Sequence, residues 1–508
     1  MAVAPVADLI ARELAQTDFH ARLPMHRRVY ESLRQAILQH RLDAGDRLPS
    51  SRDLAAELGI SRNTVMSAFN QLIAEGYVDA SVGSGTYVSD TFARPLAQHA
   101  RGHRATAPSP ARAPAPLPPA PAELSRRGAA LIAHGGAEHF EVQPFAGEDA
   151  EDWGSFPVKI WQRLQNKHWR AADTSLLDYD TQGGAMRLRR AIANYLRISR
   201  SVNVTPEQVL ITAGTQQSID LAARMLADAG ETAWIENPCY WAAERVLRAN
   251  GLSLRAIAVD DEGVSPNAED LATHPRLIYV TPSHQYPSGV IMSLARRRQL
   301  LDFAARTGAW ILEDDYDAEF RYEGRPIASL QGLDGNGRVL YMGTFSKVLY
   351  PGMRIGYIVV PPALLDALRV GLYDLQRPGQ LMVQAALADF IEMGYFASHI
   401  RRQRQVYGQR REALVRALQS VLGQALSLSP IQTGLHLVIH LPAEIDDAAL
   451  AETCAREGIG VLPLSRYYIA MPVARGLVVG YAYVREDVIE TRGRVLGRLV
   501  KKALAQRG

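Results

Sequence analysis

The 508-residue sequence contains little lysine: of its 56 lysine and arginine residues, only five are lysines. They are Lys159, Lys167, Lys347, Lys501 and Lys502. Arginine carries almost all of the positive charge, so a lysine inside a patterned segment needs a separate explanation. A lysine amine, unlike a guanidinium, can lose its proton and attack a carbonyl to form a Schiff base. Lys347 lies between two apolar runs in "GTFSKVLYPGMRIGY". The alternative is a surface lysine beside a turn.

Cysteine is also scarce. The two cysteines, Cys239 and Cys454, form neither a metal-binding nor a disulfide pattern, so we expect no metal ion and a reducing environment. The N-terminal segment contains Asp8 and Glu13 and lacks a basic n-region, which argues against a signal peptide. No apolar run reaches the roughly 18 residues that a membrane-spanning helix needs. The sequence therefore predicts a cytoplasmic protein without a membrane partner.

Composition changes once along the chain. Residues 104–124 are mostly Pro and Ala and show no apolar periodicity. Such a segment cannot bury a core and is typical of an extended linker. We therefore expect an N-terminal unit over residues 1–90, a linker over 91–125 and a larger unit over 126–508, since a chain of this length exceeds one ordinary domain.

The N-terminal unit has the pattern of a helix-turn-helix. Ser51 is placed to cap a short helix, Gly59 to make the turn, and Ser61 to cap a second helix that Gly76 ends. A preceding helix and this second helix each carry an apolar face, formed by Val29, Leu33, Ile37 and Leu38 and by Val65, Phe69, Leu72 and Ile73.

Polar residues remain at the start of the second helix, where helix-turn-helix proteins contact base edges. A hairpin around Gly83, Ser84 and Gly85 follows. A generic helical bundle is the alternative, because such patterns also occur by chance. The order of helix, helix-turn-helix and hairpin resembles the winged helix-turn-helix domain of GntR regulators over residues 24–90, with "LPSSRDLA", "ISRNTV" and "GSGTYV" as the matches. The resemblance implies binding to double-stranded DNA through Arg52, Arg62, Asn63, Thr64 and Gly85.

The larger unit alternates apolar strand patterns with helix patterns, which predicts an α/β fold with a parallel sheet and crossover helices. Polar motifs follow the expected strands. Gly214, Thr215 and Gln216 open a helix whose free N–H groups can hold a phosphate. Asp314 follows a buried strand, and Lys347 follows another. Because ligands collect at the carboxyl ends of parallel strands, we expect these groups to share one site.

Together these motifs suit pyridoxal phosphate. Its aldehyde needs a lysine, its ring nitrogen a carboxylate, and its phosphate amides and an arginine. Its ring needs a flat partner, which Tyr240 can supply by stacking. Residues 140–505 resemble the fold-type I aminotransferases. The resemblance implies that Lys347 forms the Schiff base, Asp314 meets the ring nitrogen and Tyr316 the phenolic oxygen. It assigns the phosphate to Gly214, Thr215, Gln216, Thr344 and Arg354, and the phosphate of a neighbouring subunit to Tyr179.

A winged helix joined to such a domain resembles the MocR/GabR subfamily, whose typical motifs are similar to "SHQYPSG", "EDDYDAEFRY" and "GTFSK". This resemblance implies a homodimeric transcription regulator rather than an enzyme, and a dimer that is domain-swapped as in the GABA-responsive member. It further implies that the regulator senses a small amine or amino acid through an external aldimine. Two alternatives stay open: a regulator that responds to pyridoxal phosphate itself, and a working aminotransferase.

The sequence departs from the wider family in places. The asparagine of the family's "NPTG" motif is absent, and Gln285 or Tyr286 occupies its region. An effector carboxylate needs an arginine fork, and the family places one in the C-terminal region that holds Arg466 and Arg475. Arg466 is preferred because similar regulators carry it in a similar phrase; a solvated loop arginine is the alternative. The GABA-responsive member has an arginine where this chain has Ala242, which makes GABA a poorer candidate.

Overall fold

The computed structural model describes residues 6–11, 23–39, 41–81, 85–89, 124–125, 127–129, 143–146, 156–171, 173–324, 328–425 and 427–506. The chain divides into two compact units, Met1–Pro119 and Ala120–Gly508. Most of the expected linker lies outside the described residues, as do Gly83 and Ser84 of the expected hairpin turn.

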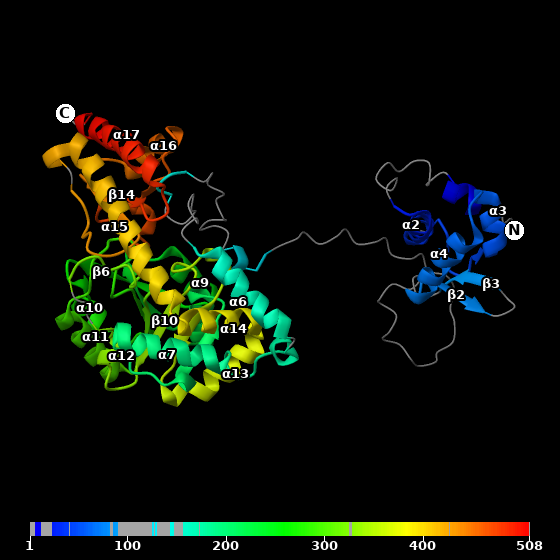
Figure 1. Cartoon of the computed structure of the whole chain (residues 1–508), viewed down its shortest axis with the longest axis horizontal. Coiled ribbons are helices and arrows are strands. Elements are labelled where there is room, and N and C mark those ends of the chain that lie inside the picture. Colours follow the sequence, from blue (N-terminus) through cyan, green and yellow to red (C-terminus); the bar gives the residue numbers. More distant parts are fainter. Residues whose placement is uncertain are drawn as a thin grey trace, which may run out of the picture. The chain divides into compact units, whose positions relative to one another are not determined.

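The first unit packs helices against a small antiparallel sheet with the strand order β1-β3-β2 (Figure 1). Its core is apolar and includes Val29, Leu33, Leu54, Val65 and Leu72, all fully buried. The elements in chain order are α2 (Met25–Leu38), β1 (Arg47–Leu48), α3 (Ser51–Leu58), α4 (Arg62–Ala74), β2 (Val78–Ser81) and β3 (Gly85–Val88).

The caps of the two short helices differ in part from the expectation. Ser61 caps α4, and its hydroxyl accepts from the Thr64 N–H at 3.2 Å. Ser50, rather than Ser51, caps α3, because Ser50 has the extended backbone of a cap while Ser51 is already helical. Leu38 and Ile73, expected in the core, are 43% and 38% exposed, whereas their neighbours Ile37 and Leu72 are buried, so the buried face of each helix is narrower than expected.

The second unit is built on an eight-stranded sheet with the order β4-β11-β10-β9-β8-β5-β6-β7. Strands β10, β9, β8, β5 and β6 pair in parallel, whereas β11 runs antiparallel to both β10 and β4. The antiparallel strand was not expected. It follows because no crossover helix joins β10 to β11, and only antiparallel neighbours can do without one. The strands are β4 (Val209–Thr212), β5 (Thr232–Asn237), β6 (Ser253–Asp260), β7 (Gly263–Val264), β8 (Leu277–Val280), β9 (Trp310–Asp314), β10 (Val339–Thr344) and β11 (Gly356–Val359).

Helices cover both faces of this sheet, so consecutive strand residues are apolar and point to opposite sides. Leu312 packs with the helices of one face, whereas its neighbour Ile311 packs with those of the other. The first face is covered by α8 (Thr215–Leu226), α9 (Trp241–Ala249) and α13 (Leu365–Gln376). The second is covered by α11 (Leu294–Thr307) and α12 (Leu330–Leu333). The short α10 (Ala268–Leu271) lies beyond β7 in the chain.

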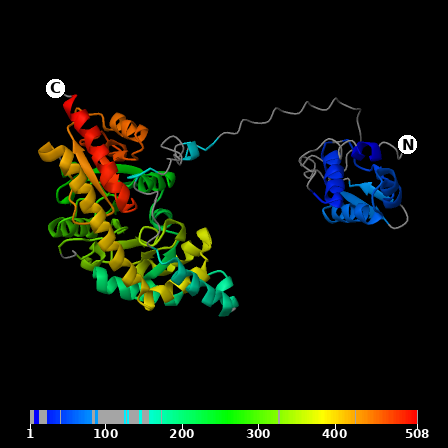
Figure 2. The same cartoon turned by 45° about the horizontal axis from the view of Figure 1, so that its top comes forward.

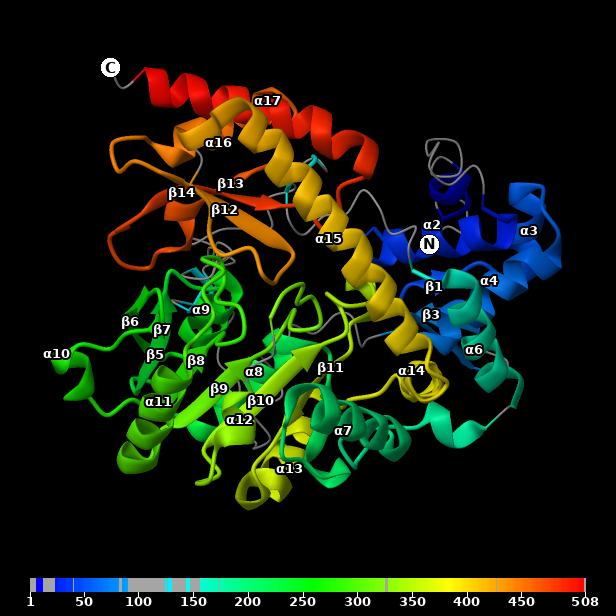
Figure 3. The same ribbon diagram turned by 60° about the vertical axis from the view of Figure 1, so that its left-hand side comes forward.

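The C-terminal part contains a second, three-stranded antiparallel sheet with the strand order β12-β14-β13. Helix α15 runs from this sheet towards α14 (Figure 3), and lies beside α17 in each view (Figure 1 and Figure 2). The C-terminal elements are α15 (Tyr395–Leu422), β12 (His436–Leu441), α16 (Asp447–Arg456), β13 (Leu462–Pro463), β14 (Arg475–Gly480) and α17 (Glu486–Ala505). Helices α6 (Val158–Ala171) and α7 (Met186–Arg200) come before the large sheet in the chain and pack against α14 (Leu381–Glu392).

Candidate functional site

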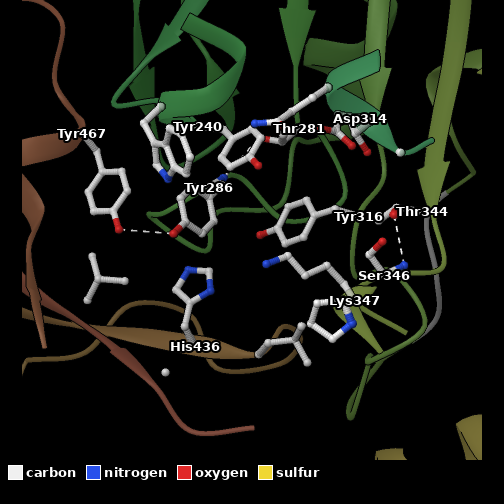
Figure 4. Close-up of a pocket in the computed structure, with 18 of the residues that line it drawn as sticks. Tyr240, Thr281, Tyr286, Asp314, Tyr316, Thr344, Ser346, Lys347, His436 and Tyr467 are labelled. Carbon is white, nitrogen blue, oxygen red and sulfur yellow. Dashed lines mark hydrogen bonds between the residues drawn. The ribbon is translucent and has the colours of Figure 1, made fainter. Parts of the chain in front are cut away.

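A cavity of about 340 Å³ opens where the ends of the central strands face residues of the small sheet. Figure 4 shows side chains from both parts pointing into it. The cavity brings together most of the site residues expected from the sequence. Its lining includes Gly214, Thr215, Gln216, Tyr240, Asp314, Tyr316, Thr344, Lys347 and Arg354.

Strand ends explain this convergence. Asp314 is the last residue of β9, and Thr344 is the last of β10. These strands pair in parallel, with Met342 opposite Asp314, so their carboxyl ends meet at the same edge. Lys347 follows β10 directly, and the Tyr483 hydroxyl donates to the Lys347 carbonyl at 3.0 Å. The lysine therefore enters the cavity from a backbone that a long-range hydrogen bond holds.

Asp314 has one satisfied and one unsatisfied oxygen. Its Oδ2 accepts from the Tyr279 hydroxyl at 2.7 Å, whereas Oδ1 is buried and has no hydrogen-bond partner among the described residues. Burial raises the pKa of Asp314 to about 7, although the Tyr279 hydrogen bond opposes the shift. A buried carboxylate oxygen without a donor is costly. Oδ1 therefore marks a place where a cationic or proton-bearing ligand atom fits.

We expect Asp314→Asn to change the pH dependence of stability in the cofactor-free protein. The folded pKa of about 7 exceeds the unfolded value of about 3.9, so folding takes up a proton between these values. The stability of the wild type should therefore fall relative to the variant as pH rises through this window, and the difference should then stay constant. Thermal unfolding of both proteins at about pH 4 and about pH 8 measures this difference in stability. An equal difference at both values would contradict the assignment.

Hydrogen-bond donors gather at the start of α8. Gly214 is its N-cap with a φ of 119°, which favours glycine. A Cβ atom there would lie 3.7 Å from the Arg354 guanidinium, so the arginine approaches this backbone closely. The hydroxyls of Thr215 and Ser346 are buried and have no hydrogen-bond partner in the described parts of the chain. Free N–H groups, two hydroxyls and a guanidinium form a cradle for a phosphate.

The opposite wall is aromatic, and the sequence did not reveal most of it. The hydroxyls of Tyr286 and Tyr467 lie 3.2 Å apart, and the rings of Tyr240 and Tyr286 meet edge to face at 5.7 Å. His436 of β12 also lines the cavity. Burial, followed by the neighbouring His284, lowers the pKa of His436 to about 3, so this imidazole is neutral. Ser346 and Tyr286 lie within the motifs "GTFSK" and "SHQYPSG", whereas no motif of the sequence analysis contains His436.

Three expected site residues lie elsewhere: none of them is among the described residues that line the cavity. Tyr179 is 61% exposed, and the Arg377 guanidinium lies 5.7 Å from its ring centroid. Arg466 is exposed on the segment just before Tyr467. Arg475 pairs with the buried Asp447 at 3.1 Å.

The expected DNA contacts lie on the surface of the first unit. Arg52, Arg62 and Asn63 are exposed at the starts of α3 and α4, and Arg62 Nε donates to the Ser51 hydroxyl at 3.4 Å. The Thr64 hydroxyl shares a 2.8 Å hydrogen bond with that of Ser61. Gly85 has a φ of 116°, and a Cβ there would lie 3.0 Å from Arg47 Nε.

In the parts of the chain that the structure describes, no helix is long and apolar enough to cross a membrane. Within the same residues, no group of three or more His, Cys, Asp or Glu side chains is arranged to hold a metal ion.

Comparisons with known proteins find a different family in each of the two compact units. Residues 25–88 match the family "Bacterial regulatory proteins, gntR family", and residues 146–491 match "Aminotransferase class I and II". The "Probable rhizopine catabolism regulatory protein MocR" of Rhizobium meliloti is 40% identical over 467 residues, 92% of this chain and 91% of that protein. The "HTH-type pyridoxine biosynthesis transcriptional regulator PdxR" of Corynebacterium glutamicum is 29% identical over 463 residues, 90% and 92% of the two chains.

Solved structures match the larger unit. The kynurenine aminotransferase of Pyrococcus horikoshii, in complex with PMP, superposes with a TM-score of 0.66 at 26% identity. The match covers 72% of this chain and 92% of that one.

The cavity fits pyridoxal phosphate on its own chemistry. It contains a lysine amine, a buried carboxylate oxygen that lacks a partner among the described residues, and a cradle of donors at a helix start. The match to a named regulator extends over both units and not over the aminotransferase part alone. The chain therefore belongs to the MocR/GabR subfamily of GntR-family transcription regulators, in which a DNA-binding winged helix-turn-helix is joined to an aminotransferase-like domain that uses pyridoxal phosphate.

Proposed function

We propose that this regulator senses a small amine or amino acid through pyridoxal phosphate bound at Lys347, and that effector binding changes its affinity for an operator. The observation that carries the proposal is the shared cavity of Lys347 and Asp314, in which Asp314 Oδ1 has no partner among the described residues. In this proposal residues 1–90 bind DNA, residues 91–125 form the linker, and residues 126–508 bind the cofactor and the effector.

The side chains of the cavity divide into three roles. Lys347 would attach the cofactor, Asp314 Oδ1 would meet the ring nitrogen, and the Tyr316 hydroxyl would donate to the phenolic oxygen. Tyr240 would stack on the ring. Gly214, Thr215, Gln216, Thr344 and Arg354 would hold the phosphate, and we add the hydroxyl of Ser346 to this set.

When bound, pyridoxal phosphate supplies an electrophilic carbon at which one amine can replace another. With the cofactor carried by an effector amine instead, Lys347 would remain as a separate amine in the cavity, beside Tyr316 and His436 (Figure 4). Charge and packing in the cavity then differ between the states with and without effector. A ligand shifts a conformational equilibrium only through such differences.

For an effector that carries a carboxylate, we propose Arg466 as its partner. Arg466 directly precedes Tyr467, which lines the cavity, so its backbone lies at the edge of the site. Arg475 is the second candidate, but it already pairs with Asp447, which is buried and also accepts from the Gly476 N–H at 3.2 Å. Moving Arg475 would leave a buried carboxylate with less compensation.

A paired screen tests the proposal. The purified holoprotein is mixed with amines and amino acids, and the visible spectrum and the operator affinity are recorded on the same samples. We expect one class of compound to change both. Compounds that shift the spectrum without any effect on DNA binding would contradict a sensing role.

A response to pyridoxal phosphate itself is the second candidate, because a relative spanning most of this chain is named for pyridoxine biosynthesis. In that case the cofactor alone changes operator affinity in the apoprotein, and no amine adds to the effect. Residual aminotransferase activity is a separate question, which turnover with a 2-oxo acid acceptor answers.

We also propose that the protein is a homodimer in which Tyr179 reaches the partner's cofactor phosphate. Tyr179 is exposed in the single chain, and large apolar side chains between residues 158 and 186 are exposed as well, as expected for a segment that meets a partner. These are Val158, Trp169, Leu177 and Met186. A domain-swapped arrangement, in which each winged helix contacts the partner's large unit, is a further feature of this proposal.

Tyr179→Phe is expected to weaken cofactor binding about tenfold, since it removes one hydrogen bond to a charged group. Tyr373→Phe is the matched control, because the Arg377 guanidinium also lies 5.6 Å from the Tyr373 ring centroid. Cofactor titration of both variants gives the affinities, and light scattering at micromolar concentration gives the mass. A monomer, or equal affinities for the two variants, would rule out the shared site.

A further inference from the structure

A buried histidine and a buried aspartate lie behind Tyr316. His284 and Asp317 are each 1% exposed. Asp317 Oδ2 lies 2.8 Å from His284 Nδ1, and the Tyr316 hydroxyl oxygen lies 3.0 Å from the same nitrogen. His284 Nδ1 thus lies within hydrogen-bonding distance of two oxygen atoms. Because a carboxylate oxygen can only accept, the short contact with Asp317 favours a proton on Nδ1.

The other ring nitrogen supports the same tautomer. His284 Nε2 is buried and has no hydrogen-bond partner among the described residues. A Cβ atom at Gly434 would overlap the imidazole, and one at Gly289 would lie 3.4 Å from Nε2, so glycines leave a slot for this ring. A buried N–H without an acceptor is rarer and costlier than a bare acceptor atom. The contacts of the two ring nitrogens therefore favour the tautomer of His284 with its proton on Nδ1.

This proton determines what the Tyr316 hydroxyl can do. Since Nδ1–H points at both oxygens, the Tyr316 oxygen accepts from His284 and cannot donate to it. Its own proton has two acceptors left: Asp317, which is also a hydrogen-bond partner of the hydroxyl, and a ligand atom in the cavity, where Figure 4 shows the hydroxyl facing the Lys347 side chain. Because the His284 N–H already occupies Asp317 Oδ2 at 2.8 Å, it weakens the first of these acceptors and favours the second. We propose that Asp317 and His284 are positioning residues that fix Tyr316 as a hydrogen-bond donor towards the cavity.

The inference rests on the proposed cofactor site, where the acceptor is the phenolic oxygen. The surrounding charges agree with a donor role. Burial, followed by the charges of Asp317 and Asp314, raises the pKa of Tyr316 well above its usual value, so the hydroxyl keeps its proton at neutral pH. His436 packs 5.1 Å from the His284 ring and is neutral, with its pKa lowered to about 3. The titratable and charged groups facing Tyr316 and His284 are Asp314, Asp317, Glu236, Tyr286, Lys347, Arg354 and His436.

The tautomer can be observed without cofactor. In protein labelled with ¹⁵N-histidine, NMR should show one imidazole in the Nδ1–H form near neutral pH, and this signal should vanish in His284→Asn. In Asp317→Asn the amide can donate to Nδ1, so the proton should move to Nε2. An imidazole with its proton on Nε2 in the wild type, or a doubly protonated one, would overturn the proposal.

The effect on the site can be read from the colour of the holoprotein. A hydrogen bond donated to an oxygen favours its deprotonated form. Without His284 the Tyr316 proton can turn to Asp317, so His284→Leu should raise the pH midpoint of the visible absorption by about one unit. His284→Asn keeps an N–H at the Nδ1 position and should leave the midpoint near that of the wild type. Leucine and asparagine are both uncharged, so charge does not explain a difference in midpoint between the two variants.

A double-mutant comparison separates positioning from a structural role. If His284 acts through Tyr316, Tyr316→Phe should raise the midpoint as well, and adding His284→Leu to it should cause no further shift. Additive shifts, or an unchanged midpoint in a folded, coloured His284→Leu protein, would overturn the inference. A holoprotein whose colour is not attached to Lys347 would instead overturn the proposed function, so the two failures are distinguishable.

Discussion

Lys347→Arg is expected to give a folded, DNA-binding protein that has no visible colour and no response to effector. Arginine preserves the positive charge but cannot form the covalent link that a lysine amine forms. In the wild type, borohydride should trap the cofactor on Lys347, which a peptide map can locate. The visible absorption should be lost completely in the variant, whereas operator affinity without effector should change by less than about twofold, because Arg62 and the other expected DNA contacts belong to a separate compact unit.

Lys167→Arg is the matched control for this experiment. Lys167 makes a 2.8 Å ion pair with Asp389 and is 57% exposed, so the same substitution there should leave both colour and effector response intact. Lys347→Ala provides a second test, since it removes the charge as well: it too should bind DNA and ignore the effector. A trapped adduct on another lysine, or a normal effector response in either Lys347 variant, would refute the assignment.

Three of the residues that the sequence predicted to share one site lie where a strand pattern ends. Asp314 and Lys347 stand at such positions, and so does Gly214, which follows β4 and opens α8. The carboxyl ends of parallel strands meet at one edge, so the sequence order of strands was enough to predict that these residues converge. Their meeting in one cavity is a consequence of sheet topology and needs no detail of side-chain packing.

The rest of the cavity depends on packing between distant segments. Tyr467 reaches Tyr286 across 181 positions of sequence, and His436 belongs to a strand of the smaller sheet. The link from Asp317 through His284 to Tyr316 joins side chains of two loops, and its geometry requires a glycine at position 434. Hydrophobic periodicity gives no register between such segments, so the aromatic wall and the positioning pair could not be predicted.

Local errors in the first unit have a similar origin. The pattern "LPSSRD" offers consecutive serines as caps, and periodicity alone does not tell them apart. The structure selects Ser50 because its side chain accepts from the Asp53 N–H at 3.2 Å, three residues on. Leu38 and Ile73 continue the apolar spacing of their helices but are exposed, although the preceding residues Ile37 and Leu72 are buried. The apolar spacing predicted the helices correctly and overestimated the width of their buried faces.

Arg62→Ala is expected to reduce operator affinity by about ten- to a hundredfold for each half-site, corresponding to roughly 1–3 kcal/mol for a bidentate contact to a base. Arg62 is the first residue of α4 and is exposed, and its Nε donates to the Ser51 hydroxyl at 3.4 Å, which orients the side chain beside the turn. Residues at the start of the second helix are those that reach base edges in this fold. Fluorescence anisotropy with labelled operator gives the affinities, and the visible spectrum of the bound cofactor should not change.

Two comparisons decide whether this loss reflects base recognition or only lost positive charge. Arg494→Ala removes an arginine from α17 of the large unit, where its partner is Glu490 on the next turn, and it should leave operator binding unchanged. Loss of a contact to a base should weaken binding to the operator far more than binding to unrelated DNA. Loss of a contact to phosphate should weaken binding to both DNAs alike and lower the salt dependence of binding. If Arg62→Ala binds the operator as tightly as the wild type, α4 is not the recognition helix, and the DNA contacts must then be sought around Arg52 and the hairpin that contains Gly85.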